Sequence, residues 1–260
     1  MSVLSHFQSV ASAAILSTAE TASIKTSIAT LSSRLTSHFG KDVSSQLRFG
    51  SSTRGTILPR KMDEKSDIDY MIVFSDTTLK PQSYLDRLKK FADTYYSSSE
   101  TKQSHPSIVL ELNHIKFDLV PAISLWSGGY QIPDRNIAWL NTDPVGFSNQ
   151  LEEANKRSSS LLKPAIRVVK FWNARRGYPL ESFSLEKWMA GHSYWNCSNL
   201  RDYVLYAFDQ LNPNAYSVKW ISEELSRAKD LSKKVREYED GAYPLTAEQE
   251  AKKLVPAPPT

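Results

Sequence analysis

The sequence has few of the residues that mark disulfide-bonded, zinc-binding or membrane-spanning proteins. Cys197 is the single cysteine among the 260 residues, which excludes an internal disulfide framework and a cysteine-based zinc site. We therefore expect a reducing compartment, the cytoplasm, as the location. No apolar run reaches the roughly 18 residues of a membrane span. The stretch from Val10 to Leu16 is apolar but follows no basic segment, so we expect a helix there and not a signal peptide.

Neither sign of charge dominates, and histidine is scarce. The 32 Lys and Arg residues exceed the 28 Asp and Glu residues by four, and the formal net charge is +4. This mild excess suits an anionic ligand but does not require a nucleic-acid partner. The histidines show neither metal-ligand spacing nor a nucleophile motif, and we expect all of them to be structural or exposed: His6, His38, His105, His114 and His192.

Apolar patterns divide the chain into a part with strands and a part made of helices. The patterns predict strands over 46–50, 68–74, 107–112 and 115–123, and helices over 2–16, 17–39 and 81–96. Ser17 and Glu20 have the spacing of a capping box, and Gly40 ends the long helix. Helices are expected further on at 159–175, 182–191, 199–211, 216–238 and 246–253.

These elements predict an α/β (α+β) core with a mixed sheet, followed by a helical C-terminal domain. We place the core, with the N-terminal helices, at residues 1–158 and the helical domain at 159–254. Residues 255–260 are rich in proline and are expected to be a disordered tail.

Three segments carry residues that suit phosphate and metal chemistry. Gly50 permits close approach of the backbone to a phosphate, and Ser51 offers a hydroxyl and an amide. Asp67 and Asp69 share one face of an expected strand, about 6.6 Å apart along it. Asp118 interrupts an otherwise apolar strand. Taken alone, the three segments are also typical of a loop, a solvated strand end and an exposed hairpin residue.

Together the three segments predict a two-metal site. Neighbouring carboxylates on an apolar strand are unfavourable unless a cation neutralises them, and hard oxygen ligands suit Mg²⁺, with Mn²⁺ as an alternative. In such a site one ion activates an attacking hydroxyl, and the other holds a triphosphate and stabilises the leaving pyrophosphate. We expect Asp67 and Asp69 to bridge both ions and Asp118 to help deprotonate or orient the acceptor hydroxyl through the first ion.

These motifs resemble those of the DNA polymerase β-like nucleotidyltransferase superfamily. The resemblance rests on Gly50-Ser51, Arg54-Gly55-Thr56, 66–69 and 117–121, and the segments 162–173 and 180–186 are similar to the bacterial cGAS/DncV-like nucleotidyltransferases (CD-NTases) of anti-phage signalling. It implies a nucleotidyltransferase core, and contacts of Lys170 and Ser182 of the helical domain with the triphosphate. Lys163 and Arg167 lie on the same basic stripe as Lys170, and their roles stay open.

The resemblance implies a Mg²⁺-dependent enzyme that condenses nucleoside triphosphates (NTPs) into a cyclic or linear oligonucleotide second messenger. Its partners would be NTPs and, through the diffusible product, a downstream effector. A regulatory protein is a further possible partner. Neither a membrane nor a nucleic acid is required. Two alternatives remain: a transferase acting on RNA or tRNA 3′ ends, and an inactive binding module or antitoxin, although such proteins usually lose a metal ligand.

Aromatic residues offer weaker hints. Tyr130 and Trp139 lie in stretches that resemble loops, and we regard them as candidates for stacking on a base. Trp172, Trp188 and Trp195 lie in or near expected helices, and we expect them in the core.

Overall fold

The computed structural model describes residues 2–134 and 138–259, which form two compact units. We call Ser17–Gly55 with Lys65–Asn149 the sheet unit, and Met1–Leu16, Thr56–Glu64 and Gln150–Thr260 the helical unit. Helix α5 (Pro144–Arg157) begins in the sheet unit and ends in the helical unit. None of the described helices combines the length and the apolar composition needed to cross a bilayer.

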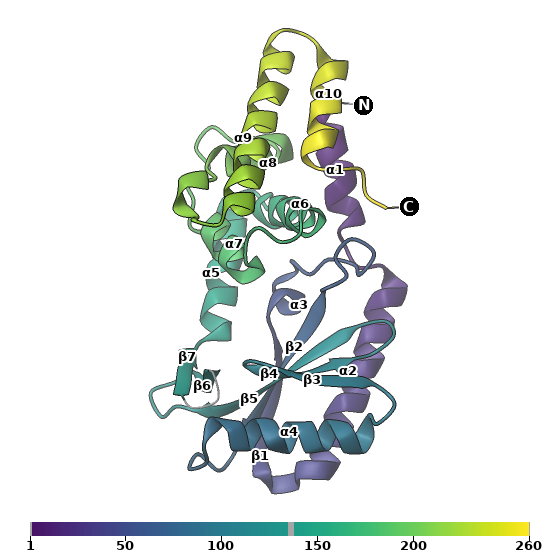
Figure 1. Ribbon diagram of the computed structural model, residues 1–260, viewed down its shortest axis with the longest axis vertical. Helices are drawn as coiled ribbons and strands as arrows, with labels where there is room; N and C mark the ends of the chain where they lie inside the picture. Colours follow the sequence, from purple (N-terminus) through teal and green to yellow (C-terminus); the bar gives the residue numbers. More distant parts are fainter. Residues whose placement is uncertain (1, 135–137, 260) are drawn as a thin grey trace. The chain divides into compact units, whose positions relative to one another are not determined.

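The sheet unit is built, in its described residues, on seven strands in one mixed sheet (Figure 1). The strand order is β1-β2-β5-β4-β3, with β6 beside β5 and β7 beside β6. β2 and β5 are parallel, and the other pairs are antiparallel. The strands are β1 (Val43–Phe49), β2 (Asp67–Phe74), β3 (Glu100–Ser104), β4 (Ser107–Glu111), β5 (Lys116–Ser124), β6 (Tyr130–Asp134) and β7 (Ala138–Thr142).

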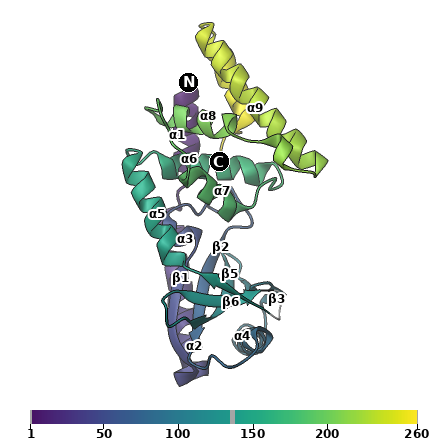
Figure 2. The same cartoon turned by 90° about the vertical axis from the view of Figure 1, so that its left-hand side faces the viewer.

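Two long helices cover one face of this sheet. The capping box of α2 (Thr18–Phe39) is present as predicted, because Ser17 N donates to Glu20 Oε2 at 2.8 Å and Glu20 N donates to Ser17 Oγ at 3.2 Å. α4 (Pro81–Tyr95) packs beside β3 to β6 and is seen end-on in Figure 2. Tyr84 of α4 meets Phe74 of β2 with ring centroids 5.1 Å apart. The helices therefore bury the face of β2 that carries its aromatic and branched residues.

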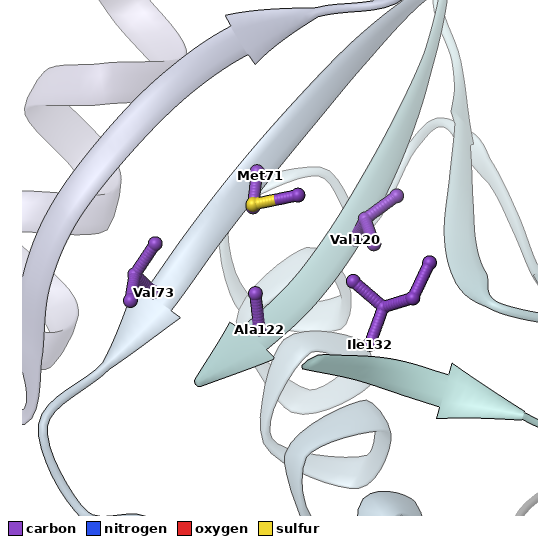
Figure 3. Packing of buried hydrophobic residues seen from close by; sticks show 5 residues of the cluster. All are labelled: Met71, Val73, Val120, Ala122 and Ile132. Atoms are coloured by element: carbon purple, nitrogen blue, oxygen red, sulfur yellow. The ribbon is translucent and has the colours of Figure 1, made fainter. Parts of the chain in front are cut away.

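The opposite face of β2 carries the predicted acidic residues and then a small apolar cluster. Side chains alternate along a strand, so Asp67 and Asp69 share a face with Met71 and Val73. Figure 3 shows the cluster formed on this face by β2, β5 and β6: Met71, Val73, Val120, Ala122 and Ile132. All five are buried. This apolar packing holds the strands that carry the carboxylates in a fixed position.

The helical unit holds α1 (Val3–Ala13), α6 (Leu162–Arg175), α7 (Ser182–Ala190), α8 (Leu200–Asp209), α9 (Lys219–Asp240) and α10 (Pro244–Leu254). α1 packs against α6, α8 and α10, and α9 and α10 run side by side (Figure 1). Trp172 of α6 is buried as expected and meets Phe208 of α8 edge-on at 5.2 Å. The mixed sheet and the helical C-terminal region confirm the expected fold class.

Several local expectations differ from the structure. The expected boundary grouped residues 1–16 with the core, whereas Phe7 and Val10 of α1 are buried among the helices of the helical unit. Val255, expected to begin a disordered tail, is buried, and its carbonyl hydrogen-bonds His6 Nε2 at 2.8 Å. Trp195, expected in the core, is 80% exposed because the segment between α7 and α8 leaves it uncovered.

Two aromatic residues lie on strands and not in loops. Tyr130 begins β6 and packs against the apolar cluster, and Trp139 lies on β7 with its ring 5.6 Å from that of Tyr84. Both strands are short, and local patterning does not reveal that β6 pairs with β5 and that β7 pairs with β6. The intervening residues 135–137 lie outside the described residues.

Candidate active site

The site begins at the turn from β1 into the short helix α3 (Ser51–Arg54). Gly50 has φ of +74° and ψ of −157°, a region that residues with a Cβ rarely adopt. A Cβ at this position would lie 1.7 Å from Asp69 Oδ2, so the backbone passes directly beside that carboxylate. Ser51 follows as the first residue of α3 and is half-buried. The turn is held by Thr53, whose hydroxyl donates to the Gly50 carbonyl at 2.9 Å.

Strand register brings two of the predicted carboxylates together. On the parallel pair β2 and β5, Asp69 lies opposite Asp118, and Asp67 lies opposite Lys116. Neighbouring strands are about 4.8 Å apart, so paired side chains on one face are adjacent. β1 pairs with β2 on the other side, with Phe49 opposite Asp69. Three adjacent strands therefore place Gly50, Asp69 and Asp118 in one place.

Lys116 is a member of this cluster that the sequence analysis did not single out. Its ammonium Nζ lies 2.9 Å from Asp67 Oδ2 and 3.7 Å from Asp118 Oδ1. Burial of Lys116 acts to lower its pKa, but the attraction of Asp67 and Asp118 outweighs burial, and the pKa is raised. The available signal was the spacing Lys116-Phe117-Asp118, which puts the lysine and the aspartate on one face of a strand.

The carboxyl of Asp118 has a strongly raised pKa. Burial first, and the negative charge of Asp67 second, raise the pKa of Asp118 to about 6, against the opposing effects of Lys116 and Ser107. Ser107 Oγ donates to Asp118 Oδ2 at 3.3 Å. The other oxygen, Oδ1, is buried and accepts no hydrogen bond. A cation at this oxygen would stabilise the ionised carboxylate.

These residues fit a divalent metal by their chemistry. Asp67, Asp69 and Asp118 supply carboxylate oxygens, and with Lys116 the four side chains carry a net charge of −2 when all are ionised. Among residues 2–134 and 138–259, no three His, Cys, Asp or Glu side chains already surround one point suited to an ion. Asp67 and Asp118 instead face the Lys116 ammonium.

The two predicted triphosphate contacts of the second half lie in the helical unit. Lys170 of α6 is buried, and its ammonium donates to Glu186 Oε1 of α7 at 2.8 Å. Ser182 is the first residue of α7 and is half-buried. The carboxylate of Glu181 caps this helix by accepting from the backbone N–H groups of the next turn. The contact of Lys170 and Ser182 with a triphosphate stays a prediction.

The other two residues of the basic stripe on α6 are Lys163 and Arg167, and both are partly buried. Lys163 forms an ion pair with Glu152 of α5. Burial lowers the pKa of the Arg167 guanidinium. The ion pair gives Lys163 a role in packing α6 against α5, and the role of Arg167 stays open.

The fold that carries this site is that of the bacterial CD-NTases. The chain is similar to the Bradyrhizobium diazoefficiens CD-NTase CdnG in complex with GTP, with a TM-score of 0.72 and 12% identity, over 97% of this chain and 98% of that chain. It is also similar to CdnC of E. coli MS115-1 in its complex with HORMA-deltaN, with a TM-score of 0.64 and 15% identity, over 92% of each chain.

Residues 1–155 match the Second Messenger Oligonucleotide or Dinucleotide Synthetase domain (SMODS), and the chain belongs to this family. A cyclic AMP-AMP-AMP synthase from an Acinetobacter strain is 28% identical over 155 residues, which cover 57% of this chain and 44% of that protein. The chain spans about half the length of the two curated relatives it matches, 44% and 51%. The resemblance stated from the motifs is thereby confirmed, and the family is metal-dependent.

Proposed function

We propose that the chain is a Mg²⁺-dependent nucleotidyltransferase that condenses NTPs into a cyclic or linear oligonucleotide second messenger and releases pyrophosphate. The observation that carries this proposal is the pairing of Asp69 with Asp118 on adjacent parallel strands, beside Gly50. Membership of the SMODS family and the similarity to a cyclic AMP-AMP-AMP synthase support the class of product.

The three aspartates would hold two Mg²⁺ ions, with Mn²⁺ as an alternative. When bound, these ions neutralise triphosphate charge and activate the acceptor hydroxyl. Asp67 and Asp69 would hold both ions, and Asp118 would help deprotonate or orient the acceptor hydroxyl. The buried Asp118 Oδ1, which accepts no hydrogen bond, supports a ligand role for this carboxylate.

The remaining predicted residues would bind the triphosphate. Gly50 lets the backbone come close to it, and Ser51 donates an amide and a hydroxyl. Lys170 and Ser182 would hold further phosphate oxygens. An ammonium has three N–H donors, so Lys170 keeps donors for a phosphate while it donates to Glu186.

The partners follow from the product class. NTPs are the substrates, and a separate effector would respond to the diffusible product in anti-phage defence of the CBASS type. A regulatory protein partner fits the similarity to CdnC, which is seen in complex with HORMA-deltaN. The cytoplasmic location expected from cysteine usage belongs to the same proposal, and neither membrane nor nucleic acid is required.

The test incubates the purified chain with labelled NTPs and Mg²⁺ and identifies products by mass, which gives base content and ring closure. We expect pyrophosphate release that Asp69→Asn and Asp118→Asn abolish. Asp93→Asn, which alters an exposed ion pair on α4, is the matched control and should stay active. No pyrophosphate from any of the four NTPs, alone or with candidate activators, would contradict the proposal.

Two other outcomes would identify the alternatives. Extension of a tRNA by a single NTP, seen as a shifted band on a gel, would indicate a transferase for RNA 3′ ends. Biological function that survives Asp69→Asn would indicate a binding module or antitoxin.

A further inference from the structure

We propose that Lys116 is an internal counter-cation of the acidic cluster, which competes with divalent metal for Asp67 and Asp118 and thereby weakens metal binding. Lys116 is a positioning residue in this proposal, because it acts through the two aspartates. The proposal rests on the proposed function to the extent that these aspartates are the metal ligands.

Lys116 lies close enough to both aspartates to neutralise part of their charge. Lys116 lies opposite Asp67 in the register of β2 and β5 and two residues before Asp118, so the three side chains share one face of the sheet. Its ammonium reaches both carboxylates, at 2.9 Å and 3.7 Å. The Lys116 side chain is only 19% exposed, so solvent and salt screen these attractions less than they screen surface pairs.

Lys116 faces the same Asp118 oxygen that a metal ion would use. Asp118 Oδ2 accepts from Ser107, which leaves Oδ1 as the oxygen for a cation, and Oδ1 is the Asp118 oxygen that lies 3.7 Å from Lys116 Nζ. A divalent ion bound at this oxygen and at Asp67 would repel the ammonium at close range. Metal binding must therefore displace Lys116.

The fold also gives the Lys116 ammonium an alternative carboxylate partner. Glu111 of β4 lies opposite Lys116 in the antiparallel register of β4 and β5, so both side chains project from the same face. A lysine has a long flexible stem and a compact charge, and it can exchange one carboxylate for another. Lys116 can thus move from Asp67 and Asp118 toward Glu111 when a metal arrives.

A purely structural ion pair would look different. In the sheet unit, Lys89 and Asp93 pair one to one at 2.7 Å on the surface of α4, with 41% and 53% of their side chains exposed. Lys116 instead serves two acids, and a third, Asp69, lies opposite Asp118. Without Lys116, the negatively charged carboxylates would face one another. Their repulsion would destabilise the metal-free protein and favour the binding of a divalent ion.

The experiment measures Mn²⁺ binding by calorimetry, without nucleotide, on the full chain after treatment with a chelator. We expect Lys116→Met to bind Mn²⁺ about tenfold more tightly than the wild type, because one competing charge is removed. Lys116→Arg keeps the charge and should bind much as the wild type does. Lys89→Met removes the exposed pair on α4 and should leave the affinity unchanged.

Thermal unfolding provides a second measurement, in which Lys116→Met should weaken the metal-free protein although it strengthens Mn²⁺ binding. We expect Lys116→Met to unfold at a lower temperature than the wild type in chelator, and to gain more from added Mn²⁺. If Lys116→Met does not fold, Lys116→Gln takes its place in both measurements.

The outcomes separate this proposal from the proposed function. If the wild type binds Mn²⁺ and Lys116→Met binds it equally or more weakly, Lys116 does not compete and the inference is wrong. If neither protein binds Mn²⁺, the proposal of a metal site is wrong, and the inference about Lys116 is wrong as well. Tighter binding in Lys116→Met but not in Lys116→Arg supports the inference.

Discussion

In the helical unit the Lys170 ammonium lies 2.8 Å from Glu186, and both side chains are buried. In the sheet unit the Lys116 ammonium lies near two carboxylates, Asp67 and Asp118. The first arrangement balances its charge within the chain, and the second leaves an excess of negative charge. A buried ion pair with balanced charge holds two elements together. A cluster with an excess of one charge is instead stabilised by a ligand of opposite sign.

Another ion pair of the helical unit, Arg236 with Asp209, follows the balanced pattern, whereas Arg201 faces two carboxylates, those of Asp202 and Glu239. Arg236 of α9 donates to Asp209 of α8 at 2.8 Å, and Arg201 of α8 donates to Glu239 of α9. These pairs join neighbouring helices. We therefore expect substitutions in the helical unit to change stability first, and substitutions in the acidic cluster to change ligand binding first.

The largest effect is expected from breaking the balanced pair. Lys170→Met leaves the Glu186 carboxylate buried without its ammonium, and the free energy of unfolding should fall by about 3–5 kcal/mol. Adding Glu186→Met should recover most of this loss in urea unfolding. Lys219→Met, in an exposed pair with Glu223, is the control and should change little. Unchanged stability in Lys170→Met would contradict the comparison. A double variant that is stable but inactive would support a triphosphate contact.

The second prediction concerns the acidic cluster. Gly50→Ala would press a Cβ against the Asp69 carboxylate, and we expect pyrophosphate release to fall by about 100-fold or more. Gly55, at the other end of α3, also has a positive φ, of +73°, but a Cβ there meets no described atom within 4 Å. Gly55→Ala therefore tests backbone strain alone and should keep most of the activity. Equal losses in both variants would mean that strain, and not the approach to Asp69, is responsible.

The third prediction uses the raised pKa of Asp118. In chelator the folded chain keeps this proton up to about pH 6, whereas the unfolded chain loses it near the ordinary pKa of 3.8. The folded state then binds more protons, so the free energy of unfolding should fall by about 2–3 kcal/mol as pH rises through this window. Asp118→Asn should remove the fall. Unfolding in urea at several pH values measures it, and an equal fall in the variant would assign it to other groups.

Much of the site was predictable because its signals are local. The strands over 68–74, 107–112 and 115–123 follow from short apolar runs, and β2, β4 and β5 lie there. The capping box at Ser17 and the glycine at position 50 are equally local features.

What could not be predicted depends on contacts between distant segments. The sequence does not show that β5 lies parallel to β2, which sets Asp69 opposite Asp118 and Asp67 opposite Lys116. The role of Lys116 was missed for that reason. Likewise, the apolar stripe of α1 shows that the helix is buried but not which helices bury it. Domain boundaries drawn along the chain cannot represent a unit assembled from three segments.

The smallest effect on the free energy of unfolding is expected at His6 of the helical unit. Its contribution should change with pH in the direction opposite to that of Asp118 in the sheet unit. Burial lowers the pKa of His6, and Lys252 adds to this, while the hydrogen bond to Val255 and the charge of Glu248 oppose it. The unfolded chain therefore binds the His6 proton more readily, and the free energy of unfolding should fall as pH falls below about 6.5. His6→Gln keeps a hydrogen-bonding group without the titration, so the difference between wild type and variant isolates His6. In chelator, acidification should thus weaken the contact of α1 with Val255 while it relieves the charge on Asp118. A difference that stays constant between pH 7.5 and 5.5 would show that His6 protonates as readily in the folded chain as in the unfolded one.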